Sequence, residues 1–218
     1  MTVPGRIEAA AILLRLTPRP RLVRHSRGVA EVAGWLAARV VACGGTLDRR
    51  LAETGALLHD IDKALPSTWR DLPHGRGSAA WLADHGLDEL APVVADHPVT
   101  RLADRAWFED WLATSPLEAR IVAYADKRVA QRLGPMDDRF ADWDRRYRRR
   151  SRPETERREI RARADRLERD VCAAAGCRPI DVRRLRWTAA AMRAATRMGA
   201  ATGRSPAAPA GSPGLDAR

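Results

Sequence analysis

The sequence is poor in cysteine, lysine and aromatic residues, and these shortages help to exclude several classes of protein. The three cysteines, Cys43, Cys172 and Cys177, are scattered along 218 residues, which excludes a disulfide scaffold of the secreted type. No apolar run reaches the roughly 18 residues that a membrane-spanning helix needs, and the first residues show no signal-peptide pattern. These absences predict a cytoplasmic protein without a membrane partner.

Strand signals are also scarce, because aromatic residues make up 5% of the chain and β-branched residues are few. Helical periodicity recurs instead, and an apolar content of 45% is enough for a buried core. The sequence therefore predicts an all-α fold. Helices are expected at about 21–42, 48–63, 78–84, 88–96, 116–133, from 136, between 153 and 176, and through Val182, Leu185, Ala189 and Met192. The helix at 116–133 is expected to begin with a capping box of Ser115 and Glu118.

The net charge of +11 is concentrated towards the C-terminus. Residues 1–140 hold 19 Lys+Arg against 18 Asp+Glu, and residues 141–218 hold 20 against 10. Acidic residues interrupt the arginine-rich run at 145–169, as on a solvated helix, so a nucleic-acid partner is not favoured. We expect a domain at 1–150, a helical extension at 151–198 and a disordered tail at 199–218 that is rich in Ala, Gly, Ser and Pro. The sequence gives no indication of the oligomeric state.

A few titratable residues lie in apolar stripes, in an apolar segment or in a glycine-rich loop: His25, His59, Asp60, His74, His97 and Asp126. His25 lies at helical spacing from Val29 and Val32, so its side chain is expected to face the core. Asp126 lies in the same way between Val122 and Val129.

Inward-facing carboxylates and imidazoles indicate a shared cation. A buried carboxylate without a partner costs on the order of several kcal/mol or becomes neutral. Imidazole with carboxylate and no thiolate suits Fe, Mn, Zn or Ni better than a pure Mg site. Six such side chains exceed the needs of one ion with an open position, so we expect two divalent metal ions bridged by a carboxylate.

At these residues the sequence resembles the HD superfamily of metal-dependent phosphohydrolases. The segment LLHDIDK at 57–63 is similar to the signature of the HDIG-type variant, with Asp62 in place of the usual glycine. The order of the six residues resembles that of dinuclear members, among them the symmetrical dinucleoside tetraphosphate hydrolases. The segment YADKRV at 124–129 is also similar to small HDIG-type proteins. The resemblance covers about residues 18–150.

This resemblance implies an HD-domain helical bundle with the site at its centre. It implies that His25, His59, Asp60 and Asp126 hold one ion and that His74 and His97 complete a second, with Asp60 bridging the two. The implied activity is hydrolysis of a phosphoester or phosphoanhydride in a small nucleotide-like substrate through a metal-bound hydroxide, with Asp60 as a catalytic residue.

Basic side chains near these ligands are candidates for binding substrate phosphates. Lys63 follows His59 by about one helical turn and is the first candidate for both catalysis and substrate binding. Four further candidates adjoin the other ligands along the chain: Arg76, Arg101, Lys127 and Arg128. Asp62 is expected to orient a ligand histidine.

Two other functions stay open. An HD-type di-iron oxygenase would use the same ligands, and it would be recognised by iron content together with oxygen uptake. A non-catalytic signalling or binding module is the other alternative. Loss of metal ligands is the usual mark of such modules, and all six expected ligands are present here, so this function ranks last.

Overall fold

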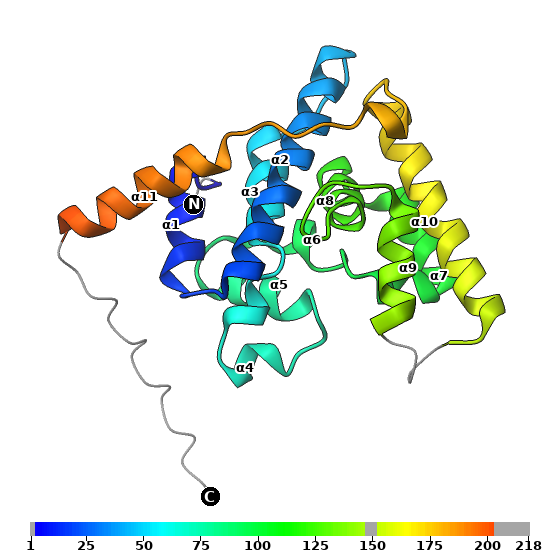
Figure 1. Cartoon of the computed structure of the whole chain (residues 1–218), viewed down its shortest axis with the longest axis horizontal. Coiled ribbons are helices and arrows are strands. Elements are labelled where there is room, and N and C mark those ends of the chain that lie inside the picture. The colour runs from blue at the N-terminus through cyan, green and yellow to red at the C-terminus, as the bar shows by residue number, and fades with distance from the viewer. Residues whose placement is uncertain (1–2, 147–151, 203–218) are drawn as a thin grey trace, which may run out of the picture.

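The computed structural model describes residues 3–146 and 152–202 and is all-α, as the sequence predicts (Figure 1). Within those residues no β-strand forms, and one isolated bridge joins Val129 to Leu133. By length and hydropathy, none of the described helices could span a membrane. With η marking 3₁₀ helices, the elements are α1 (Arg6–Arg15), α2 (Pro20–Ala42), α3 (Arg49–Leu58), η1 (Ile61–Ala64), α4 (Ser67–Arg70), α5 (Arg76–Asp84), η2 (Asp88–Leu90), α6 (Ala91–Val94), η3 (Val99–Ala103), α7 (Arg105–Thr114), α8 (Leu117–Arg128), α9 (Met136–Arg146), α10 (Glu154–Ala174), η5 (Pro179–Asp181) and α11 (Thr188–Thr202).

Helices α2, α3 and α8 pack against one another at the centre of the molecule. The apolar stripe of α2 is fully buried at Val29 and Leu36, and that of α8 at Ile121 and Val122. Between α3 and α8 the chain forms short helices, of which α6 packs against both α3 and α8 and α5 packs against α6. This arrangement brings the ends of several elements to one side of the central helices.

The helix that begins at Asp48 is shorter than predicted. The Asp48 carboxylate caps it by accepting from the backbone N–H of Arg50 and Leu51, as the sequence indicates. The α-helix ends at Leu58 rather than at 63, and the chain continues as the tighter turn η1. The His59 imidazole bonds the carbonyl of Ala56, and Asp60 leaves helical geometry at φ −108° and ψ 15°.

The predicted capping box at the start of α8 is wrong. Ser115 and Pro116 are both extended, with ψ of 147° and 150°, so Ser115 ends α7 and Pro116 precedes the first turn of α8. The Glu118 carboxylate instead accepts a hydrogen bond from the backbone N–H of Asp48, at 2.6 Å. A contact with another helix start has replaced the local cap. Helix α8 also ends at Arg128 rather than at 133.

The segment through Val182 and Leu185, predicted to be helical, runs as an extended strap across α2 (Figure 1). The buried Glu31 carboxylate accepts hydrogen bonds from Arg184 and Thr188, and the Glu31 carbonyl accepts the backbone N–H of Leu185. These tertiary bonds take the place of helical ones, so α11 begins only at Thr188.

The C-terminal helices share the core of the remaining chain. Helix α10 packs against α8, and α11 packs against α1 and α2. Ile160 and Leu167 of α10 and Ala191 of α11 belong to the same apolar cluster as the residues of α2 and α8. Helix α11 continues to Thr202, past the expected boundary at 198, and the remainder of the expected tail lies outside the described residues.

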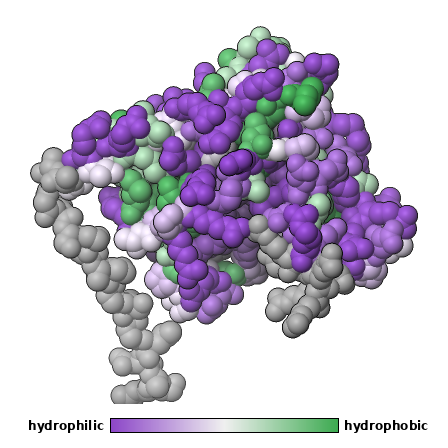
Figure 2. All heavy atoms as spheres, in the orientation of Figure 1, coloured by the Kyte–Doolittle hydropathy of each residue, from purple (hydrophilic) through white to green (hydrophobic). Residues whose placement is uncertain are grey.

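The face shown in Figure 2 is mainly hydrophilic, with smaller apolar areas between charged side chains. The arginines of α10 largely pair with acidic residues of the same chain. Arg161 lies 2.9 Å from Asp165, and Arg163 contacts Glu159 and the carbonyl of Leu102.

Candidate metal centre

The six side chains that the sequence singles out come from separate elements and converge at one place. His25 lies on α2, His59 and Asp60 follow α3, and Asp126 lies in the last turn of α8. His74 immediately precedes the turn into α5, and His97 follows α6. All except His74 are at least nine-tenths buried.

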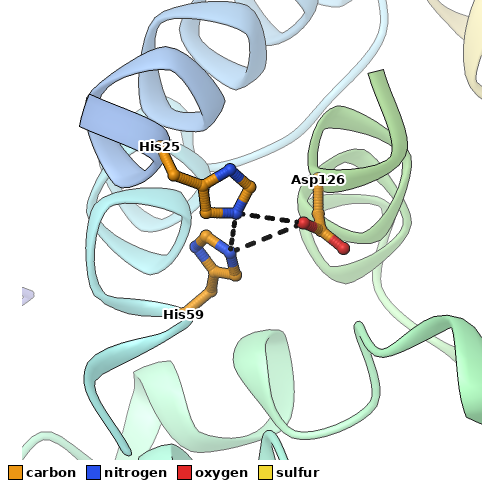
Figure 3. A group of neighbouring side chains, drawn as sticks. All are labelled: His25, His59 and Asp126. Carbon is orange, nitrogen blue, oxygen red and sulfur yellow. Dashed lines mark hydrogen bonds and ion pairs between the residues drawn. The ribbon is translucent and has the colours of Figure 1, made fainter. Parts of the chain in front are cut away.

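The first group consists of His25, His59 and Asp126 (Figure 3). The two imidazole Nε2 atoms are 3.2 Å apart, and they lie 3.2 and 3.8 Å from Asp126 Oδ1. Two ligand atoms that each lie about 2.1 Å from the same metal ion are roughly 3.0–3.4 Å apart. The group is therefore close to the size that one transition-metal ion needs.

The second group consists of His74, His97 and Asp60. The Nε2 atoms of His74 and His97 are 3.3 Å apart, and they lie 3.1 and 3.4 Å from Asp60 Oδ1. The other oxygen, Asp60 Oδ2, lies 3.4 Å from the Nε2 atom of His25 and 3.5 Å from that of His59. Asp60 thus stands between the groups and directs one oxygen toward each.

The outer nitrogen of every imidazole has an oxygen partner. The Nδ1 atoms of His25, His59 and His97 lie 3.1, 2.7 and 2.6 Å from the backbone carbonyls of residues 130, 56 and 94, and His74 Nδ1 lies 2.8 Å from Asp62 Oδ2. A carbonyl only accepts, so Nδ1 of those three imidazoles is the donor. Neutral imidazoles then direct their Nε2 lone pairs inward, which is the orientation of metal-ligating histidines.

The donor set fits a pair of cations. Asp60 Oδ1 is fully buried, and when the two imidazoles that face it are neutral with inward lone pairs it has no hydrogen-bond donor among the described residues. A buried carboxylate oxygen without a hydrogen bond is costly, and cations between the groups would satisfy both it and the inward lone pairs.

Electrostatics also favour positive charge between these groups. Burial acts to raise the pKa values of Asp60 and Asp126, but the surrounding histidines hold both well below the usual range. Burial lowers the pKa of His59 to about 3, so this imidazole is neutral. Although burial opposes it, contact with Asp60 and Asp62 raises the pKa of His74 to about 9. In the metal-free chain, the proton on His74 thus supplies part of the positive charge that a metal ion would supply.

Asp62 supports His74, as the sequence predicts for this residue. Its Oδ2 atom lies 2.8 Å from His74 Nδ1 and 3.0 Å from the backbone nitrogen of Gly75, which donates to it. Gly75 has φ +85°, and a Cβ atom there would lie 2.5 Å from the carbonyl oxygen of Ala95. The tight turn therefore requires glycine both for its backbone conformation and for space.

A cavity of about 650 Å³ opens onto the two groups. His25, Asp60 and His74 contribute to its wall, and so does Lys63, whose Nζ atom lies 2.6 Å from Asp60 Oδ2. The cations that line the cavity come from several elements: Arg19, Arg21, Lys63, Arg70 and Arg139. The cavity is therefore suited to an anionic ligand.

The other four predicted substrate-binding residues do not line this cavity. Arg76 and Arg101 both pair with Asp96, at 2.8 and 3.2 Å. Lys127 is buried and donates to the carbonyls of His97 and Ala123, so it ties α8 to the loop that carries His97.

Arg128 is also buried, and it donates to the carbonyl of Gly134 at 2.7 Å and to that of Pro179 at 3.1 Å. The contacts of all four residues favour a structural role rather than a contact with substrate.

Sequence reasoning missed the cavity arginines Arg19, Arg21, Arg70 and Arg139. No spacing distinguishes them in a chain with 39 Lys+Arg, and they come from three separate parts of it. Arg139 alone carried a local signal, an aromatic residue four positions later on a helix, Trp143, over which its guanidinium stacks at 4.5 Å.

The family model described as HD domain matches residues 22–170 of the chain. The matched range contains all six converging residues and extends into α10. No curated protein and no solved structure matches the chain.

Proposed function

Since the chain belongs to the HD domain family, we propose that it is a metal-dependent phosphohydrolase acting on a phosphoester or phosphoanhydride of a nucleotide-like substrate. The position of Asp60 supports this most directly. One buried carboxylate faces two pairs of inward imidazoles, with a separate oxygen for each pair.

Six side chains would hold two divalent cations: His25, His59 and Asp126 for the first, His74 and His97 for the second, and Asp60 between them. When bound, such a pair lowers the pKa of water and polarises a phosphoryl oxygen. Fe, Mn, Zn and Ni all suit the nitrogen and oxygen donors.

The chain's own residues orient the reaction. The carbonyls of Ala56, Val94 and Ala130 fix three imidazole rings, and Asp62 fixes that of His74. The Lys63 ammonium stands at the cavity wall, 48% exposed, where it contacts a phosphoryl oxygen and offsets charge that develops there.

A measurement of metal content coupled to a phosphate-release screen tests this function. The purified protein is analysed for Fe, Mn, Zn and Ni and assayed on mononucleotides, dinucleoside polyphosphates and simple phosphomonoesters. We expect about two ions per chain and phosphate release that is lost on chelation and restored by one of these metals.

The variant Asp60→Asn should lower phosphate release by more than about 100-fold, because one oxygen of the bridging carboxylate becomes a neutral amide donor. Asp84→Asn, a change at an exposed residue that does not line the cavity, serves as the control and should match the unaltered protein. Full turnover by Asp60→Asn with unchanged circular dichroism would contradict the proposed function. Bound iron with oxygen uptake and no phosphate release would favour the oxygenase instead.

A further inference from the structure

Arg139 lies at the cavity and combines stacking on an aromatic ring with substantial burial. It comes from α9, which follows the expected ligands, and its side chain is only 14% exposed. The guanidinium lies over the ring of Trp143, and its Nε atom is buried without a hydrogen-bond partner. The Nη2 atom lies 3.9 Å from Asp126 Oδ1, beyond hydrogen-bond distance, so among the described residues the stacked guanidinium has donor capacity that is not satisfied.

The carboxylate nearest to Arg139 is a proposed metal ligand. Among the described residues, its one ion pair joins Nη2 to Asp126 Oδ1 at 3.9 Å. The same oxygen faces the Nε2 atoms of His25 and His59, at 3.2 and 3.8 Å. A cation held by this group would compete with Arg139 for the carboxylate of Asp126, its ion-pair partner among the described residues.

Lys63 likewise forms an ion pair with a proposed metal ligand, in this case Asp60. Its described ion pair joins Nζ to Asp60 Oδ2, the oxygen that also faces His25 and His59. A bound metal ion would therefore compete with Lys63 for Asp60 and with Arg139 for Asp126. It would also add positive charge beside both basic side chains. Two cationic side chains in a cavity then require an anion from outside.

We propose that Arg139 is a substrate-binding residue that donates to a phosphoryl oxygen, and that metal loading releases it for this role. The identity of the anion as a phosphoryl group rests on the proposed function. The planar guanidinium matches two oxygens of a tetrahedral oxyanion at once, whereas the ammonium of Lys63 contacts one as a point charge.

The test compares Arg139→Gln and Arg139→Lys with Arg145→Gln, a matched change on the same helix at a side chain that is 63% exposed and pairs with Asp142. Binding of Mn²⁺ is measured by competition with a chromophoric chelator. Binding of inorganic phosphate is measured by calorimetry, with and without Mn²⁺. Thermal unfolding confirms that each variant is folded.

We expect Arg139→Gln to bind phosphate about 10- to 100-fold more weakly in the Mn²⁺-loaded state, since a charged donor is lost. Its affinity for Mn²⁺ should be equal to or higher than that of the unaltered protein, because a competing cation is gone. A residue with only a structural role would weaken both. Arg139→Lys should recover part of the phosphate affinity, and Arg145→Gln should change neither measurement.

Phosphate affinity of Arg139→Gln within twofold of the unaltered protein overturns the inference. Equal phosphate binding with and without Mn²⁺ overturns the claim that metal releases the arginine. If Arg139-dependent phosphate binding is found but no substrate releases phosphate, the anion site stands and the proposed hydrolase function fails, so the two failures are distinguishable.

Discussion

Asp60 shows how much of the candidate site depends on one residue that leaves helical geometry. Had α3 continued to 63, as its sequence pattern predicts, the carboxylate would follow the helical register of His59. The break after Leu58 instead sets Asp60 between the two imidazole pairs, 3.1–3.5 Å from four Nε2 atoms. The position of Asp60 between the two imidazole pairs is a property of this turn.

Lys127 is a second residue whose role depends on burial. Burial lowers its pKa from 10.5 to about 8, while its Nζ atom donates to the carbonyls of His97 and Ala123. The folded chain therefore holds this proton more weakly than the unfolded chain does.

The resulting pH dependence has a definite sign. Between pH 8 and 10.5 the unfolded chain binds more protons at this site, so the contribution of Lys127 to stability rises with pH across that window. The gain amounts to about 3 kcal/mol at most. Urea unfolding of the metal-free protein at several pH values, compared with Lys127→Met, isolates it. We expect the difference between the two proteins to change across the window, and parallel pH profiles would refute the assignment.

At the scale of single residues, the sequence supports a substantial part of the site. Helical spacing indicates that His25 and Asp126 face inward, and the structure places both there. Spacing carries no information on which arginine reaches a cavity built from distant elements. Arg139 is one of many in an arginine-rich chain, so its position emerges only when α9 packs against α8.

Among the elements, the strap before α11 braces the helix that carries His25. Its anchor is Glu31, 1% exposed on α2, where Arg184 and Thr188 donate to the carboxylate. The spacing of apolar residues through Val182 and Leu185 predicts a helix. Such spacing carries no information about a hydrogen-bond partner that is distant in the sequence. The failure of the capping box at Ser115 has the same origin, since Glu118 is drawn to the start of α3.

Removing the anchor should destabilise the fold measurably. The variant Glu31→Ala leaves Arg184, 20% exposed, and Thr188 without their acceptor, and we expect a loss of about 2–3 kcal/mol in the free energy of unfolding. Asp181→Ala breaks an exposed ion pair with Arg178 just before the strap and should have a much smaller effect on the free energy of unfolding, because exposed ion pairs contribute little. Chemical denaturation measures both. Equal effects of the two variants would show that the strap is not anchored at Glu31.

For the molecule as a whole, metal binding and stability should be linked. Helices α2 and α8, the turn after α3 and the loops after α4 and α6 all carry candidate ligands, so a bound ion would connect elements that otherwise meet through apolar packing. The unfolded chain cannot assemble this set. Ions that bind only the folded state stabilise it by mass action.

Chelation should therefore lower the melting temperature. At a free metal concentration one hundred times Kd, the stabilisation by one bound ion is about 2.7 kcal/mol. For a chain of this size that corresponds to about 5–10 °C. Differential scanning calorimetry with Mn²⁺ and with a chelator measures the shift, and Asp126→Asn should show a much smaller one. A melting temperature indifferent to both treatments would argue against ion binding at the six residues.

The four imidazole rings are not oriented by equivalent means. Peptide carbonyls hold His25, His59 and His97, and these oxygens are present whatever side chains stand at positions 130, 56 and 94. His74 is held by the side chain of Asp62. The path of the main chain thus sets the orientation of three rings, whereas the orientation of the fourth depends on one side chain, that of Asp62. The second group, which contains His74, is therefore the one that a side-chain substitution can most easily disrupt.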